Sequence, residues 1–264
     1  MSPSDQKRPS GRPTRVGLWR HAAPQHAHRL AGSLVPWAWA VAALAGLAGL
    51  YVGFFVAPTD HQQGESYRII FVHVPAAWLS MVLYVAMAFW AAVGWVFNTR
   101  ASSYLARALA PTGALFTFLA LWTGALWGKP TWGTWWVWDA RLTSELLLLF
   151  LYFGVMALQS AIDDPRRGDK AGALLAVVGV VNVPIIYFSV QWWNTLHQGA
   201  SISLKAAPTL AASMLAGLLL CTVALWGWAV AVVLGRFRTI VLERERDAEW
   251  VQQLPEVKHI KEQA

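Results

Sequence analysis

The chain has 264 residues, of which 56% are hydrophobic and only 13% are charged, and its formal net charge is +7. This composition, with a mean hydropathy of +0.42, excludes a polar disordered chain and fits a soluble globular domain poorly. The sequence therefore indicates a membrane protein. The single cysteine, Cys221, excludes an intrachain disulfide framework, a thiolate cluster and a Cys-x-x-Cys redox pair.

A helix that crosses a bilayer needs about 20 largely apolar residues. Six stretches of the chain satisfy this requirement, at 36–57, 74–97, 104–127, 142–162, 172–190 and 209–234. We therefore predict an all-α integral membrane protein, a bundle of six transmembrane helices. Its expected parts are a basic disordered tail at 1–35, a six-helix membrane domain at 36–235 and a charged tail at 236–264.

The positive charges predict how the bundle lies in the membrane. The two tails and the second and fourth connections carry 17 Lys and Arg residues, whereas the other connections carry four. By the positive-inside rule, both termini are then cytoplasmic. Because the cations flank the spans and do not gather on one folded face, we predict no nucleic-acid partner.

The N-terminal tail lacks the separate apolar core and the small-residue cleavage site of a removable signal peptide. His21, His26 and His28 cluster within it. We interpret this tract as solvated, with a metal site as the alternative.

A tryptophan-rich segment at 127–141 follows the third span on the predicted non-cytoplasmic side. Its tryptophans are Trp127, Trp132, Trp135, Trp136 and Trp138. An aromatic belt at the membrane surface places fewer indoles at each helix end. If the residues after Pro130 are helical, three of the indoles share one face of a helix lying along the membrane surface. That face suits a large flat ligand, and Lys129 and Arg141 at its border can meet anionic groups. A haem matches this combination of surfaces, and a quinone or a lipid headgroup stays open as an alternative.

Two histidines on the same side narrow the choice among these ligands. His73 lies at the mouth of the second span, just before Pro75, and His197 lies in the loop after the fifth span. Two imidazoles from separate loops beside an aromatic shelf are what axial ligation of a haem iron requires. Each histidine alone is better explained as a hydrogen-bonding residue at the membrane surface, and it is the joint arrangement that favours haem. His61 lacks aromatic neighbours, and we interpret it as a loop residue.

Four polar residues near the spans have structural explanations. Arg141 and Glu145 are four residues apart, so an ion pair within one helical turn is expected. Asp139 is expected to hold an indole N–H or a loop amide. Asn182, before Pro184, is expected to support packing at a kink of the fifth span.

The run from Trp127 to Thr143 resembles the tryptophan-rich (WWD) signature of the haem-handling membrane proteins of cytochrome c maturation. The segments Phe71–Pro75 and Trp192–Gln198 and the six-span size resemble the haem exporters of that family more than its larger synthetases. The resemblance covers about residues 36–235.

The resemblance implies a protein of the bacterial inner membrane that binds haem b non-covalently at the periplasmic face and presents it to a periplasmic haem chaperone. His73 and His197 would be the axial ligands of the iron. The platform for haem and chaperone would comprise Trp127, Trp132, Trp135, Trp136, Trp138, Asp139 and Arg141. The other implied partners are an ABC-type ATPase with its membrane subunit, a small single-span subunit and membrane lipid.

The chain has no Gly-x-x-x-x-Gly-Lys-Ser/Thr loop, so ATP hydrolysis would have to come from a partner. We therefore expect a binding and transfer protein and not an enzyme. The alternatives are a membrane redox enzyme that uses haem or quinone and a substrate transporter with aromatic residues at the membrane surface.

Overall fold

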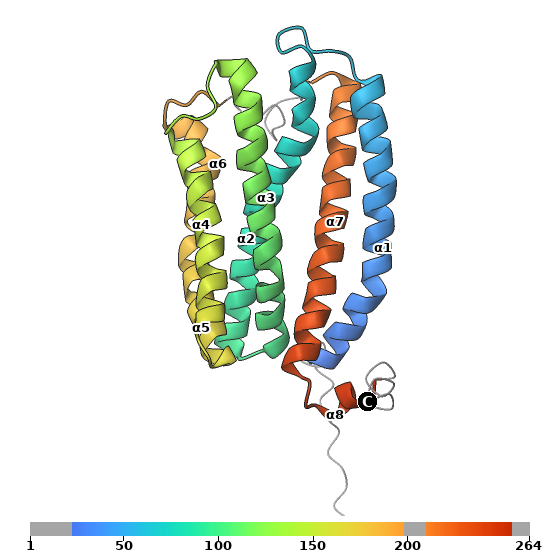
Figure 1. Cartoon of the computed structure of the whole chain (residues 1–264), viewed down its shortest axis with the longest axis vertical. Coiled ribbons are helices and arrows are strands. Elements are labelled where there is room, and N and C mark those ends of the chain that lie inside the picture. The colour runs from blue at the N-terminus through green and yellow to red at the C-terminus, as the bar shows by residue number, and fades with distance from the viewer. Residues whose placement is uncertain (1–22, 198–209, 255–264) are drawn as a thin grey trace, which may run out of the picture.

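The structure, a computed structural model, describes residues 23–197 and 210–254. Its helices run side by side along one long axis (Figure 1). The principal helices are α1 (Pro24–Tyr51), α2 (Ile70–Phe97), α3 (Arg100–Trp132), α4 (Ala140–Ala161), α5 (Pro165–Gly179), α6 (Asn182–Trp192) and α7 (Ala212–Arg244). A π-helical turn at Val52–Val56 extends α1, a 3₁₀ turn at Glu65–Ile69 precedes α2, and the short α8 (Glu249–Gln252) follows α7.

Six spans in these helices are long and apolar enough to cross a membrane, with α5 and α6 together forming the fifth. The prediction of an all-α bundle of six spans is therefore confirmed. The chain alternates between two ends of the bundle. We call the end where α1, α3 and α5 begin the basic end, and the opposite end, where α3 ends and α4 begins, the aromatic end.

The described Lys and Arg residues divide unequally between these ends. Those at the aromatic end are Arg68, Lys129 and Arg141. Those at the basic end are Arg29, Arg100, Arg107, Arg166, Arg167, Lys170, Arg236, Arg238, Arg244 and Arg246. The asymmetry expected from the sequence is therefore present in the folded bundle.

Two of the expected helix boundaries are wrong. The first helix begins at Pro24 and not at 36, so residues 24–35, expected to be disordered, are helical. Proline suits the first turn because its missing N–H would have no partner there, and the amides of His26 and Ala27 donate to the carbonyl of Ala23. The sixth span continues to Arg244 and not only to 234. Of the N-terminal histidine cluster, His21 lies outside the described residues.

Arg236 holds the part of α7 that extends beyond the expected end at 234. The guanidinium of Arg236 donates to the carbonyl of Ala108 at 2.9 Å and to the hydroxyl of Thr112 at 2.7 Å, both on α3. Because these bonds satisfy a charged group against a neighbouring helix, the helix continues past the apolar stretch that hydropathy detects.

The fifth span is broken at residues 180–181, between α5 and α6. Asn182 begins α6, and its side-chain amide donates to the carbonyl of Ser144 on α4 at 2.9 Å. The amide of Val183 turns back to the carbonyl of Val180 at 3.0 Å. Asn182 therefore supports packing at the kink, as expected.

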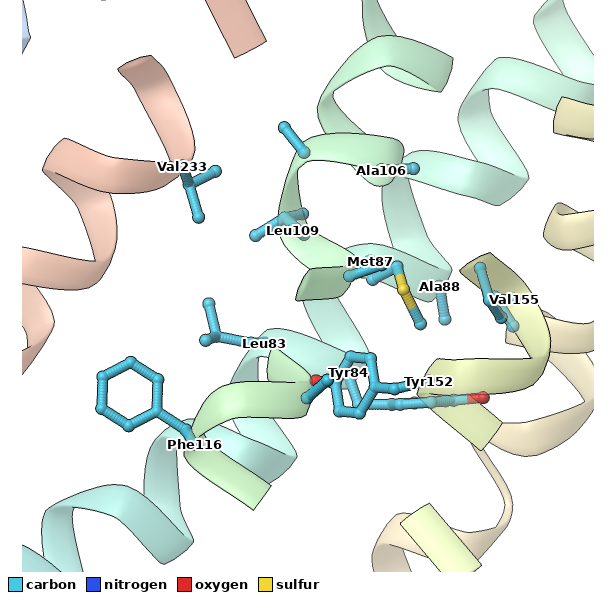
Figure 2. Close-up of a cluster of buried hydrophobic side chains, with 14 of the residues drawn as sticks. Leu83, Tyr84, Met87, Ala88, Ala106, Leu109, Phe116, Tyr152, Val155 and Val233 are labelled. Carbon is cyan, nitrogen blue, oxygen red and sulfur yellow. The ribbon is translucent and has the colours of Figure 1, made fainter. Parts of the chain in front are cut away.

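The core lies between α2, α3, α4 and α7 (Figure 2). The rings of Tyr84 and Tyr152 meet edge to face with centroids 4.9 Å apart. The hydroxyl of Tyr152 donates to the carbonyl of Ser80 at 2.8 Å. A Cβ on Gly113 would lie 2.1 Å from Cζ of Tyr152, so only glycine lets the ring approach α3 this closely. The middle of the bundle is thus packed without spare room.

Helix α1 packs along α7 (Figure 1) through small residues. A Cβ on Gly49 would meet the sulfur of Cys221 at 2.8 Å, and one on Gly227 would meet the backbone nitrogen of Ala42 at 3.0 Å. Close approach of backbones at small residues is the usual way that helices associate in a bilayer. Trp37 on α1 and Phe55 in the turn that extends it are 73% and 81% exposed, as lipid-facing residues are.

Candidate functional site

A cavity opens at the aromatic end between α2, α3 and α4. Its volume is about 70 Å³. Five of the candidate site residues predicted from the sequence line it: His73, Trp127, Trp132, Arg141 and His197. The fold therefore brings together side chains from four separate segments of the chain. It does not bring His61 into this cavity, because His61 lies on an exposed turn after α1, as expected for a loop residue.

His73 lies on α2 and not in a loop, because α2 begins at Ile70. Its side chain is buried, and Nδ1 lies 3.0 Å from the hydroxyl oxygen of Thr123 on α3. That hydroxyl donates to the carbonyl of Leu119 at 2.5 Å, so it accepts a hydrogen bond from Nδ1–H. The lone pair of His73 is then on Nε2, the form in which imidazole binds a metal.

The two imidazoles are neighbours. The ring centroids of His73 and His197 are 6.3 Å apart, with an angle of 35° between the ring planes. Trp127 meets the His73 ring edge to face at 5.6 Å, and Trp132 lies 6.2 Å from the ring of His197. A Cβ on Gly124 would lie 3.0 Å from Cε1 of His73, so the ring reaches its place because position 124 has no side chain.

The expected surface helix in the tryptophan-rich segment is wrong. Helix α3 continues through Pro130 to Trp132 and ends at Gly133, which has φ +78°. A left-handed residue ends a helix, and the amide of Gly133 closes the last turn on the carbonyl of Lys129 at 3.1 Å. Residues 134–139 are not helical. Trp132 therefore belongs to a spanning helix, whereas Trp135 and Trp136 belong to the connection that follows.

The tryptophans of the segment have two different roles in the fold. Trp127 forms part of the cavity wall and donates from Nε1 to the side-chain carbonyl of Gln63 at 2.7 Å. Trp135 and Trp138 are 54% and 77% exposed. Trp136 packs edge to face on Trp138 with centroids 5.4 Å apart. The segment thus presents an exposed aromatic surface beside the cavity.

Asp139 is the N-cap of α4. Its Oδ1 atom accepts a hydrogen bond from the amide of Leu142 at 2.8 Å. We expected Asp139 to hold either a loop amide or an indole N–H. In the structure it holds a backbone amide. The carboxylate thereby satisfies an amide that the helix leaves without an internal partner.

The expected ion pair between Arg141 and Glu145 is wrong, because within the described residues these two side chains form no salt bridge. Each has a partner on another helix. Arg141 donates to the carbonyl of Ile186 on α6 at 2.6 Å. Glu145 accepts through Oε1 from the hydroxyl of Ser80 on α2 at 2.7 Å.

Several residues of the cavity were not found from the sequence as site residues. Gln63, Gly124, Thr131 and Glu145 line it, and Thr123 orients His73. A carboxylate inside an apolar span is the one such signal that the sequence contained, because a buried charge is costly unless it is paired or used. The others are polar or small residues of ordinary type, and only the packing of α2 on α3 brings them to the histidines.

Comparison with known proteins places the chain in a family. A family model described as heme exporter protein C matches residues 17–252. The chain is 47% identical to heme exporter protein C of Haemophilus influenzae, over 89% of this chain and 97% of the relative. It is 46% identical to heme exporter protein C of Escherichia coli K12, over 90% and 96%. It is 38% identical to the Paracoccus denitrificans protein of the same name, over 87% and 95%. The chain belongs to the heme exporter protein C family.

Proposed function

We propose that this protein binds haem b non-covalently at the aromatic end of the bundle and delivers it to a periplasmic haem chaperone for cytochrome c maturation. The observation that carries the proposal is the pair of imidazoles, His73 and His197, whose rings adjoin inside a wall of indoles. The name of the relatives, heme exporter protein C, supports the same ligand.

The histidine pair suits a metal that is already coordinated by a macrocycle. Among the described residues, no group of three or more His, Cys, Asp or Glu side chains could hold a metal ion. Two histidines therefore leave a bare ion under-coordinated, whereas a haem iron has four ring nitrogens and needs axial ligands only. With metal–nitrogen bonds of about 2 Å, two imidazoles on one metal have centroids about 6 Å apart, close to the separation of 6.3 Å between these rings.

The size of the cavity indicates how a macrocycle would fit. The volume of about 70 Å³ is well below the roughly 300–1,000 Å³ of pockets that enclose a ligand of drug size. We infer that haem is enclosed only in part, near the iron, and that its edge extends toward the exposed rings of Trp135 and Trp138. We infer that His197 shifts to admit haem, because His73 is held on α2 and bonded to Thr123.

The direction of delivery follows from the charges. The positive-inside rule assigns the basic end and both termini to the cytoplasm, which assigns the cavity and the exposed indoles to the periplasmic side of the bacterial inner membrane. A soluble periplasmic chaperone can meet Trp138 there, since the side chain is 77% exposed. We assign Asp139 and Arg141 to positioning this platform, because they fix the start of α4.

The proposed chemistry is positioning. The chain holds haem in one orientation, and the reactivity belongs to the cofactor and the chaperone. Since haem arrives from elsewhere and leaves with a carrier, we expect the protein to act beside an ABC-type ATPase with its membrane subunit and a small single-span subunit.

The test is an absorption spectrum of the purified full-length protein in detergent, titrated with haemin and then reduced with dithionite. We expect a low-spin spectrum for the wild type. In His73→Ala and His197→Ala, the loss of an axial ligand should change the Soret band and weaken haem binding by more than about tenfold.

The matched control is His61→Ala, which removes an imidazole at the same end but outside the cavity and should keep the wild-type spectrum. Wild-type spectra in both His73→Ala and His197→Ala would refute the ligand assignment. A wild-type protein that takes up no haemin would refute the proposed function itself.

A further inference from the structure

A second cavity lies at the basic end, where α2, α3, α4, α5 and α7 meet. Its volume is about 200 Å³, larger than that of the cavity at the aromatic end. The described residues bring four cationic side chains to its wall, from three helices: Arg100, Arg166, Lys170 and Arg244. Asp169 is the one carboxylate among the described lining residues. Cations therefore outnumber carboxylates in the wall of this cavity, and nothing in the proposed handling of haem uses it.

Two of these cations are compensated by carboxylates of the fold. Arg100 pairs with Glu245 at 2.7 Å, and Arg244 pairs with Asp169 at 3.3 Å. Asp169 also lies 3.7 Å from Arg107, so it is shared between two guanidinium groups. The anionic residues of the site are thus already occupied by arginines of α3 and α7.

The other two cations are not compensated in this way. Within 23–197 and 210–254, no salt bridge or hydrogen bond joins the side chain of Arg166 or Lys170 to a partner. The two residues are four apart on α5, so they lie on one face of the helix, where like charges repel. An anion between them and the rest of the cavity would relieve this repulsion.

The rim of the cavity is suited to the membrane surface. Trp95, at the end of α2, lines the cavity and is 42% exposed, and Val96 and Phe97 beside it are 67% and 57% exposed. An indole next to exposed apolar residues is typical of the level where acyl chains meet headgroups. Asn98 and Thr99 then add polar groups at the mouth of the cavity. The combination is a cationic hollow with an apolar edge.

We propose that this cavity binds a phosphate group, and that the phosphate belongs to an anionic phospholipid of the membrane leaflet at the basic end. Arg166 and Lys170 would contact the phosphate, and Trp95 would lie along the first part of an acyl chain. Basic hollows between spanning helices are established binding places for lipid headgroups. A free phosphate ion shares the charge and the hydrogen-bonding geometry of the headgroup, but it would gain nothing from the apolar rim.

The experiment measures the thermal unfolding midpoint of the full-length protein in a neutral detergent during three separate titrations. The probes are phosphatidylglycerol, phosphatidylcholine and inorganic phosphate. We expect a saturable rise with phosphatidylglycerol only, since a ligand that binds the folded state stabilises it. In the double variant Arg166→Gln with Lys170→Gln, the apparent affinity for phosphatidylglycerol should fall by about 10- to 30-fold, at roughly a tenfold or smaller factor for each lost cation.

A matched double variant removes the same charge outside the cavity. Arg167→Gln with Arg246→Gln changes two exposed cations at the same end that do not line the hollow, and it should keep the wild-type affinity. Equal stabilisation by inorganic phosphate would overturn the assignment to lipid. Equal responses to the two lipids, or equal losses of affinity in the two double variants, would overturn the site.

Discussion

The middle of the bundle and its aromatic end use the same helices in different ways. In the middle, the rings of Tyr84 and Tyr152 (Figure 2) fill the space between α2, α3 and α4. They fill it so closely that Gly113 cannot carry a side chain. At the aromatic end, the cavity stays open between the same helices, and Trp135 and Trp138 remain exposed. The first region is packed against itself, and the second presents its surface to other molecules.

The buried polar side-chain atoms also differ between the aromatic end and the middle of the bundle. Buried side-chain atoms without a hydrogen-bond partner include Thr131 Oγ1, Trp136 Nε1, Asp139 Oδ2 and Glu145 Oε2, all in or beside the cavity at the aromatic end. In the middle of the bundle, the hydroxyl of Tyr84 is in this state. A buried polar atom that finds no partner of any kind lowers stability by about 1–3 kcal/mol. The polar atoms at the aromatic end are therefore groups that a ligand or partner can satisfy.

The largest expected effect on stability comes from adding one methyl group to the tightly packed middle of the bundle. In Gly113→Ala, the new Cβ would lie 2.1 Å from Cζ of Tyr152, whose hydroxyl is bonded to Ser80. The ring cannot move without losing that bond, so we expect a loss of about 3 kcal/mol or more in the free energy of unfolding. The measurement is an SDS titration in mixed micelles, followed by circular dichroism.

The control for this change is Gly235→Ala on α7, where no atom lies within 4 Å of the added Cβ. Alanine is the better helix former, so this variant should be as stable as the wild type or slightly more stable. Equal losses in the two variants would mean that helix propensity, and not the contact with Tyr152, decides the cost.

At the aromatic end, the largest effect on stability is expected from Arg141→Met. The guanidinium joins α4 to α6 through its bond to the carbonyl of Ile186 at 2.6 Å, and a bond from a charged donor is worth about 2 kcal/mol. The same SDS titration measures the loss. Lys129→Met removes a charge at the same end from an exposed side chain that bonds to Gly133, and it should change stability by less than about 1 kcal/mol. A larger loss from Lys129→Met would show that net charge at this end matters more than the tie between the helices.

A smaller effect is expected from Asp139→Ala, which removes the N-cap of α4 and should cost about 1 kcal/mol. Asp164→Ala removes the corresponding cap of α5 at the basic end, where Oδ1 accepts from the amide of Arg167 at 2.7 Å, and should cost the same. The two caps differ in function if the proposal is correct. Asp139→Ala should slow haem transfer to the chaperone, whereas Asp164→Ala should not.

The conservative variant Asp139→Asn separates the two roles of this residue. Asparagine caps a helix about as well as aspartate, so stability should be retained. Haem transfer that stays slow in Asp139→Asn would assign a direct part to the carboxylate, and wild-type transfer would reduce Asp139 to a cap.

The six spans could be predicted from the sequence because each is a long apolar stretch, and hydropathy needs no knowledge of neighbours. Successive spans cross the membrane in opposite directions, so His73, near the start of the second span, and His197, after the fifth span, could be predicted to lie at the same end. The course of 130–139 could not be predicted in this way, because Pro130 does not stop α3 and the left-handed Gly133 does.

Hydrogen-bond partners on other helices could also not be predicted from the sequence. Glu145 has an arginine four residues before it, yet it bonds to Ser80, 65 residues away, and Arg141 bonds to a backbone carbonyl of α6. Local spacing identifies the pair that a single helix permits, but in a membrane bundle a buried polar group takes whichever partner the packed helices present to it. The arrangement of α2, α4 and α6 in the bundle decides this, and no single stretch of sequence contains it.

The smallest effect concerns the turn that borders the cavity. The carboxylate of Asp60 accepts from the amides of Gln63 and Gln62 at 2.8 and 2.9 Å, and the amide of Gln63 is the main cause that lowers the pKa of Asp60 from its ordinary value of 3.8. Because the folded pKa is the lower one, the stabilisation is complete above the unfolded value and is lost as the pH falls through the folded value. We therefore expect this turn, which holds Gln63 against Trp127, to loosen in acid below its ordinary pKa while the helices persist.

Pepsin cleavage within residues 57–66 measures this loosening, since the protease acts in acid. Asp60→Asn lacks the charge at every pH, so its turn should be cut faster than that of the wild type at about pH 5, and the ratio of the two rates should approach one toward about pH 2. The ratio cancels the pH dependence of the protease itself. A ratio that stays constant over this range would show that the charge of Asp60 does not hold the turn, and that its contact with Trp127 through Gln63 depends on the packing of the aromatic end alone.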